Sequence, residues 1–223
     1  MNIETHENIT SLEVFSVDEA FLELTHCRHL YRGAKQAGAL IKAKIEGVSG
    51  VNCSVGISGD KTTAKYASKR DKPNGLTIIP PWEARQTLKH VPVTDLCGIA
   101  RGIGQYLAQH GVYRCGDMQN IPISVLSRRF GNLGRRIWLM AQGLDPDPLH
   151  LDTAPPKSLG HGKMMPPNTR NKTTILFFLN YMADKVGRRL RLNKLQSQYF
   201  YIGIKTAHGW IKTQAKTTVP TND

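Results

Sequence analysis

Cysteine is scarce in this sequence, and no two cysteines are spaced as zinc ligands. The chain has no Cys-x-x-Cys pair and no cysteine-histidine spacing of a zinc finger, which excludes the common zinc-binding modules. His26, Cys27 and His29 lie together, but ligands so close in sequence rarely complete a tetrahedron, so we expect no metal centre there. The four cysteines are Cys27, Cys53, Cys97 and Cys115.

Long apolar runs and targeting signals are missing as well. No stretch approaches the roughly 20 apolar residues that a membrane helix needs. Nothing in the sequence resembles a signal peptide. From these absences we expect no membrane partner, a reducing compartment and a cytoplasmic location.

Acidic residues are few compared with basic ones. The chain has 17 Asp and Glu against 30 Lys and Arg, which gives a formal net charge of +13. The excess rises along the chain, from −2 over residues 1–58 to +6 over 59–150 and +9 over 151–223. Such an excess indicates a polyanionic partner, most often nucleic acid, although a solvated basic surface gives the same composition. An acidic segment followed by basic ones suits an enzyme that binds metal ions at one place and a phosphate backbone at others.

Two adjacent acids, Asp18 and Glu19, lie between two short runs that alternate apolar and polar residues. This pattern predicts two strands meeting at a sharp turn, over residues 13–25. Neighbouring strand residues point to opposite faces, so both acids serve one site only if the backbone bends between them. Converging carboxylates would suit Mg²⁺. A solvated hairpin tip is the alternative, and for an isolated Asp-Glu pair it is the commoner one.

The next segments predict a helix and a strand. Residues 31–46 carry apolar residues at helical spacing, Ala34, Ala37, Leu40, Ile41 and Ile45, and the helix is expected to end at Gly47. Residues 51–58 alternate apolar and small polar residues, which predicts a half-buried strand. The order strand, strand, helix, strand favours an α+β fold.

Lysines recur every four residues in the next segment. Lys61, Lys65 and Lys69 share one helical face, and residues 73–75, Pro-Asn-Gly, end that helix in a turn. A solvated basic face explains the spacing as well as a phosphate site does. Lys72 favours the phosphate site, because it lies beside a rigid turn.

A glycine-rich hairpin is predicted in the middle of the chain. Residues 76–79 predict a strand, Pro81 opens a helix to Lys89, and residues 91–95 are a plausible domain boundary. Residues 96–112 have the arrangement of a helix-hairpin-helix unit, whose glycines let the backbone approach a phosphate. Ala100 stands where that pattern usually has a second glycine. An ordinary helical hairpin is the alternative.

The remaining segments predict more helix and one strand pair. Residues 113–144 are expected to be helical, with arginines at 128, 129, 135 and 136 and an apolar set of Leu126, Leu133, Ile137, Trp138 and Leu139. Residues 153–157 indicate a linker. Beyond it we expect a strand over 157–166, an amphipathic helix over 173–192 whose apolar residues form core, and paired strands over 198–205 and 210–217.

Taken in series, these stretches resemble the Y-family translesion DNA polymerases, in order and at comparable spacing. The resemblance covers nearly the whole chain and includes Arg129-Phe130-Gly131 and Gln142-Gly143-Leu144-Asp145. It implies an α+β fold with a partial palm at 1–90, a helical thumb with a helix-hairpin-helix at 91–150, and a linker and partial α/β little-finger domain at 151–223.

The resemblance also implies roles for individual residues. The family binds two Mg²⁺ through three carboxylates, and Asp18 and Glu19 match two of them. Lys72 matches the residue that contacts the nucleotide triphosphate, and Lys65 and Lys61 match family lysines that we assign to nucleotide and DNA binding respectively. The hairpin residues expected to contact DNA are Gly98, Ala100, Arg101 and Gly102. Implied partners are primer-template DNA, an incoming deoxynucleotide, and a sliding clamp or a separate N-terminal half.

The chain also departs from the family pattern. The third metal-binding Asp of the family precedes the Asp-Glu turn, but only 17 residues stand before Asp18 and none of Glu4, Glu7 and Glu13 sits in a matching motif. The little-finger domain also stops partway. We therefore expect a fragment or part of a split or decayed polymerase that is inactive alone. A non-catalytic DNA-binding accessory protein with the same fold is the alternative.

Overall fold

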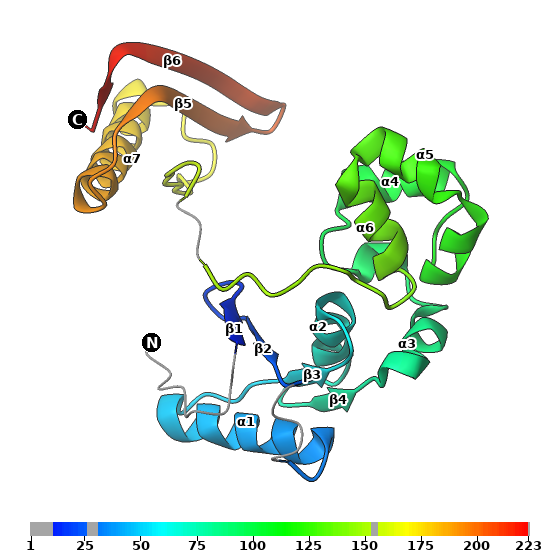
Figure 1. Cartoon of the computed structure of the whole chain (residues 1–223). Coiled ribbons are helices and arrows are strands. Elements are labelled where there is room, and N and C mark those ends of the chain that lie inside the picture. The colour runs from blue at the N-terminus through cyan, green and yellow to red at the C-terminus, as the bar shows by residue number, and fades with distance from the viewer. Residues whose placement is uncertain (1–10, 26–30, 153–155, 223) are drawn as a thin grey trace. The chain divides into compact units, whose positions relative to one another are not determined.

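The computed structural model describes residues 11–25, 31–152 and 156–222, and these form two compact units (Figure 1). The first unit comprises residues 1–153 and the second residues 154–223. Helices and strands are both present, as expected for an α+β fold. The predicted linker at 153–157 falls partly outside the described residues, and so does the cluster of His26, Cys27 and His29.

The first unit begins with the predicted strand pair. Strands β1 (Ser11–Val14) and β2 (Ala20–Glu23) are antiparallel, with Val14 opposite Ala20 and Ser11 opposite Glu23. Residues 15–19 connect them as a tight turn, which places Asp18 and Glu19 at the tip. The prediction of two strands meeting at a sharp turn is confirmed.

Helix α1 (Ala34–Ser49) begins and ends three residues later than the helix predicted over residues 31–46. It runs through Gly47 and ends at Gly50, whose left-handed φ of 68° terminates the helix. The buried side is also different, since Ala37 is 3% exposed while Leu40 is 51% exposed. A Cβ on Gly38 would lie 2.4 Å from a methyl group of Leu76, so this glycine allows the helix to approach the strands closely.

Two parallel strands lie between α1 and α2 (Lys61–Arg70). Strand β3 (Val55–Ile57) pairs with β4 (Leu76–Ile78), and residues 51–54 are not in the strand that was predicted there. The Ile57 side chain reaches α1 at Gly38, whereas a Cβ on Gly56 would lie 2.1 Å from the carbonyl oxygen of Ala64 in α2. The helices therefore cover opposite faces of the strand pair, as Figure 1 shows.

A helical layer completes the first unit. It contains α3 (Pro81–Leu88), the short 3-10 helix η2 (Val93–Asp95), α4 (Arg101–Gln109), the 3-10 helix η3 (Cys115–Asn120), α5 (Ile123–Phe130) and α6 (Asn132–Met140). Its core includes Leu88, Leu107, Met118, Leu126 and Ile137, all fully buried. Leu133, predicted among the apolar set, is instead 46% exposed.

The second unit contains α7 (Lys172–Leu192) and an antiparallel hairpin of β5 (Ser197–Thr206) and β6 (Gly209–Thr221). The helix and hairpin confirm their predictions. The strand predicted at 157–166 is wrong, because this segment, with Gly160, Gly162 and Pro166, pairs with no strand in the described part of the chain. The predicted core of α7 is sparse, with Leu190 buried and Leu176 46% exposed.

The described helices do not include one with the length and apolar character needed to cross a membrane.

Candidate active site and nucleic-acid interface

The turn between β1 and β2 bends the backbone so that both acids face the same way. The amides of Phe15 and Ser16 both donate to the carbonyl oxygen of Glu19, each at 3.0 Å. The Ser16 hydroxyl donates to Asp18 Oδ1 at 2.8 Å and also lies 3.4 Å from Glu19 Oε2. Both carboxylates thus approach one hydroxyl group, which an unbent strand would prevent.

These carboxylates have the chemistry of a magnesium site. They are hard oxygen donors on an exposed turn, and Mg²⁺ is commonly bound through one or two carboxylates together with water and substrate phosphates. Within residues 11–25, 31–152 and 156–222, no group of three or more His, Cys, Asp or Glu side chains is placed to bind a metal. The described residues therefore fit such an ion by supplying two of its ligands.

Lys65 from α2 points at the same turn. Its ammonium forms an ion pair with Glu19 Oε2 and lies 4.3 Å from the centroid of the Phe15 ring. The Lys65 side chain is 10% exposed, whereas that of Glu19 is 39% exposed. Helix α2 therefore brings a positive charge directly onto one of the two candidate metal ligands.

Lys61, one turn earlier on α2, has different surroundings. Its ammonium contacts Glu13 Oε2 at 2.9 Å, Asp147 Oδ2 at 2.9 Å and the carbonyl oxygen of Pro148 at 2.8 Å. An ammonium group has three N–H donors, so these three acceptors can use all of them. Lys61 thus joins strand β1, helix α2 and the segment after α6.

A second basic residue extends these contacts. Arg136 donates through Nε and Nη2 to the two oxygens of Asp145, at 2.8 and 2.9 Å, and its Nη1 lies 3.0 Å from Asp147. The Thr62 hydroxyl donates to Asp145 Oδ2 at 2.5 Å. We call these residues the ion-pair cluster: Glu13, Lys61, Thr62, Arg136, Asp145 and Asp147.

The cluster changes the acidity of its members. Burial alone would raise the pKa of Glu13, but hydrogen bonds from the His150 amide and from Lys61 lower it below its ordinary value. The pKa of Asp147 is also lowered, because the Lys61 hydrogen bond and the Arg136 charge outweigh its desolvation. The pKa of Arg136 is raised, first by its hydrogen bonds to Asp145.

Glu13→Gln is expected to weaken the acid sensitivity of the first unit. A carboxylate with a lowered folded pKa stabilises the protein above its unfolded pKa, here near 4.5 for Glu, and this contribution is lost as the pH falls through the folded pKa. The wild-type free energy of unfolding should therefore fall more than that of Glu13→Gln as the pH is lowered below about 4.5. Burial raises the pKa of Asp60, but this opposite effect is common to both proteins. Urea unfolding at each pH measures the difference, and equal losses in both proteins would contradict the expectation.

Lys72 lies where the chain turns back into β4. Asn74 has a positive φ of 56°, and a Cβ on Gly75 would lie 2.0 Å from the carbonyl oxygen of Asp71. The Lys42 ammonium donates to the carbonyl oxygens of Asn74 and Gly75. The turn is therefore held from α1, while Lys72 itself is exposed and makes no ion pair with Asp18 or Glu19 in the part of the chain that the structure describes.

The predicted hairpin before α4 presents its backbone to solvent. Gly98 has φ of 90°, which requires glycine. Ala100 has φ of −83° in the extended region, so alanine fits where a glycine was expected. Alanine has no side-chain acceptor, so it does not cap the first amides of α4, which have no acceptor within the helix itself. All four predicted DNA-contacting residues of this hairpin are exposed, while Leu96 and Ile99 anchor it in the core.

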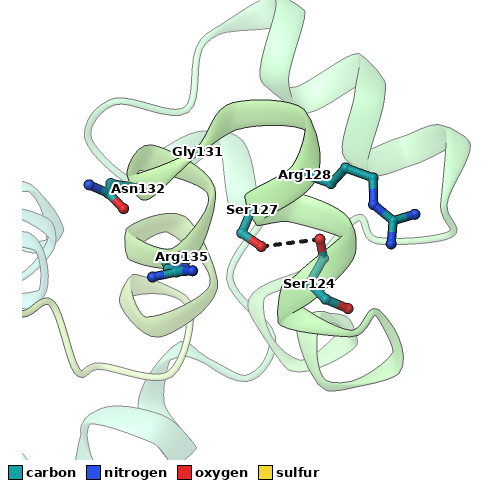
Figure 2. A pocket seen from close by; sticks show the side chains of 6 residues that line it. All are labelled: Ser124, Ser127, Arg128, Gly131, Asn132 and Arg135. Carbon is teal, nitrogen blue, oxygen red and sulfur yellow. Dashed lines mark hydrogen bonds between the residues drawn. The ribbon is translucent and has the colours of Figure 1, made fainter.

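The four arginines of the α5–α6 segment separate into distinct environments. Arg136 belongs to the ion-pair cluster, and the Arg129 guanidinium lies 5.6 Å from the centroid of the Phe130 ring. Arg128 and Arg135 instead line a pocket of about 320 Å³ at the turn between the helices, shown in Figure 2. The other lining residues are Ser124, Ser127, Gly131 and Asn132.

Sequence reasoning missed the ion-pair cluster. From the sequence, Asp145 was given a place only in the 142–145 segment of the family resemblance, Asp147 was given no functional role, and Glu13 was placed outside any matching motif. Their contacts with α2 join residues 48 and 83 positions apart, for Glu13–Lys61 and Thr62–Asp145. The available signal was the Lys61 spacing, which placed this residue on the face of α2 that Glu13 and Asp147 contact.

Three family models match the chain. The impB/mucB/samB family model matches residues 3–69, the model described as the DNA polymerase-iota thumb domain matches 94–145, and the impB/mucB/samB C-terminal domain matches 156–223. Together they cover most of the chain in order, and they include both the acidic turn and the glycine hairpin.

Curated relatives and a solved structure agree with these matches. DNA polymerase IV of Moorella thermoacetica is 34% identical over 197 residues, which cover 87% of this chain and 49% of that protein. DNA polymerase IV of Desulfatibacillum aliphaticivorans is 29% identical over 220 residues, covering 98% of this chain and 55% of that protein. A Y-family DNA polymerase chimera shares the fold, with a TM-score of 0.72 and 22% identity over 96% of this chain and 61% of that one.

The chain spans about half the length of these curated relatives. The family models, the relatives and the shared fold lead to one conclusion: the chain belongs to the Y family of DNA polymerases.

Proposed function

We propose that the chain provides the later part of the palm, the thumb and the first part of the little finger of an error-prone, template-directed DNA polymerase of the translesion type. In this proposal residues 1–90 are palm, 91–150 thumb, and 151–223 linker and partial little finger. Its substrates are primer-template DNA and an incoming deoxynucleotide. The convergence of Asp18 and Glu19 on the Ser16 hydroxyl is the observation that carries the proposal.

Asp18 and Glu19 would hold Mg²⁺ at the tip of the β1–β2 turn. Bound there, the metal would supply Lewis-acid stabilisation of the attacking and leaving oxygens in nucleotidyl transfer. Ser16 positions the two carboxylates by its hydrogen bonds, and the turn amides fix the backbone beneath them. Because the described residues supply two carboxylates, we propose that a third ligand is needed and that the isolated chain is inactive.

The lysines of α2 and its following turn divide into two roles. We assign Lys72, exposed on a turn that Lys42 holds, and Lys65, beside Glu19, to the phosphates of the nucleotide. A lysine near these phosphates offsets their charge. We do not extend a DNA-binding role to Lys61, because its three donors already have three acceptors.

DNA contacts are proposed on both units. The start of α4 suits a backbone phosphate, because the hairpin residues Gly98, Ala100, Arg101 and Gly102 are exposed and nothing lies within 4 Å of a Cβ at Gly98 or Gly102. In the second unit, cross-strand pairing places exposed aromatic residues and lysines on one face of the β5–β6 hairpin. These are Tyr199, Tyr201, Trp210, Lys205, Lys212 and Lys216. Lysines interleaved with aromatic rings favour binding to nucleic acid.

Primer extension tests the proposed function. We expect no synthesis by the isolated chain with Mg²⁺ and four deoxynucleotides. We expect template-directed synthesis when the chain is joined to the part of the Moorella thermoacetica DNA polymerase IV that it does not match. Robust synthesis by the isolated chain would refute the need for a third ligand. A chimaera that binds DNA without synthesis would favour the non-catalytic alternative.

We also propose that the exposed Arg128 and Arg135 of the α5–α6 pocket contact backbone phosphates, so Arg128→Ala combined with Arg135→Ala is expected to reduce the salt dependence of DNA binding. Each lost phosphate contact reduces the magnitude of the slope of log affinity against log salt by about 0.9. The slope of the double variant should therefore be smaller in magnitude by about 2. Fluorescence anisotropy with duplex DNA at several salt concentrations measures this slope. Arg129→Ala is the matched control, because its guanidinium lies over Phe130 and outside the pocket. A slope unchanged in the double variant would exclude the pocket from the DNA interface.

A further inference from the structure

Lys65 lies on the oxygen that a metal ion at this turn would need. Its ammonium pairs with Glu19 Oε2, the same oxygen that lies 3.4 Å from the Ser16 hydroxyl. We propose that Lys65 is a displaceable counter-ion, which neutralises the Asp18–Glu19 turn and leaves Glu19 when a divalent cation binds. This inference rests on the proposed metal site and assigns a regulatory contact within it.

The two cations cannot share this oxygen favourably. Like charges about 4 Å apart repel by about 1 kcal/mol per pair of unit charges even in bulk water, and by more near a protein surface. The Lys65 ammonium would lie within this range of an ion bound to Glu19 Oε2. Binding of the ion therefore includes the release of Lys65, which lowers the apparent affinity.

Lys65 is suited to release in a way that Lys61 is not. In the described structure, the only carboxylate paired with Lys65 is Glu19, and that side chain is 39% exposed. Lys61 contacts two carboxylates and a carbonyl oxygen, and its partner Glu13 is 8% exposed at the side chain. Releasing Lys61 would leave buried charges unpaired, whereas releasing Lys65 exposes a carboxylate that is already partly hydrated.

The Phe15 ring gives the released ammonium a second place to interact. The Lys65 Nζ lies 4.3 Å from this ring centroid, and Phe15 packs edge-on against Phe21 with centroids 5.3 Å apart. Cation–π attraction persists when the carboxylate is withdrawn. The flexible four-carbon stem of lysine allows the ammonium to move while its helix stays fixed.

Removing Lys65 should therefore strengthen metal binding, opposite to the effect of removing a ligand. We expect Lys65→Met in the full chain to bind Mn²⁺ about 3- to 10-fold more tightly than wild type by isothermal titration calorimetry, since an ion pair of this kind contributes modestly. Lys65→Gln serves as a second variant that removes the charge. Lys69→Met is the matched control, because it removes an exposed charge from the same helix.

The outcomes separate this inference from the proposed function. If Asp18→Asn and Glu19→Gln abolish Mn²⁺ binding but neither Lys65 variant tightens it more than Lys69→Met, the metal site stands and the counter-ion is refuted. If Mn²⁺ binding does not depend on Asp18 or Glu19, or is undetectable in all variants, both the proposed metal site and the counter-ion role of Lys65 are refuted. Tighter binding in the Lys65 variants that also requires Asp18 and Glu19 supports the counter-ion.

Discussion

Asp18→Asn is expected to reduce primer extension by the chimaera by about a hundred- to a thousandfold. The substitution keeps the side-chain shape but removes the charge that would hold a divalent cation beside Glu19. Loss of one preorganised electrostatic group typically reduces turnover by this factor. The rate of single-nucleotide incorporation at saturating DNA and nucleotide is the measurement.

A charge change elsewhere in the same unit provides the control. Glu46 is an exposed acid on α1, so Glu46→Gln should leave incorporation within about twofold of wild type. Duplex binding should be retained in Asp18→Asn, because Asp18 is not among the residues proposed to contact the backbone. Incorporation by Asp18→Asn at a rate close to that of the control would remove Asp18 from the proposed site.

Asp145→Ala is expected to lower the free energy of unfolding of the first unit by about 3–5 kcal/mol. The Asp145 side chain is fully buried and accepts two bonds from Arg136, one from Thr62, and one from the amide of Asp147 at 3.1 Å. Removing it leaves these donors without their acceptor and a guanidinium without its carboxylate. Urea unfolding followed by circular dichroism measures the loss.

An exposed acid in the same unit tests whether the loss is specific. Asp95 lies in η2 and is exposed, so Asp95→Ala should change the free energy of unfolding by less than about 0.5 kcal/mol. A second variant, Arg136→Met, should also destabilise by about 3–5 kcal/mol, because it leaves the fully buried Asp145 carboxylate without its guanidinium partner. Similar small losses in all three variants would show that the ion-pair cluster does not stabilise this unit.

The features predictable from the sequence were those set by neighbouring residues. Alternation around Asp18 and Glu19 predicted the β1–β2 turn, the four-residue spacing predicted the lysine face of α2, and Pro81 marked the start of α3. These are consequences of strand and helix periodicity and of the fixed φ of proline. The chain order of these motifs was also enough to identify the family.

Features that depend on distant contacts could not be predicted in the same way. Spacing placed Lys61 and Lys65 on one face but did not distinguish them, because their different roles depend on Asp147 and Glu19. The buried side of α1 was misplaced because Gly38, rather than Leu40, faces the strand pair. The prediction of a strand at 157–166 was wrong because it also depended on a distant contact: an extended segment becomes a strand only when it pairs with another strand.

Paramagnetic broadening by Mn²⁺ tests the central claim most directly, because it locates a bound metal without requiring catalysis. In nuclear magnetic resonance spectra of the full chain, substoichiometric Mn²⁺ should broaden the amide signals of residues 15–19 before other signals, and Asp18→Asn with Glu19→Gln should abolish this effect. Broadening centred elsewhere, or unchanged in the double variant, would show that the acidic turn is not a divalent-metal site.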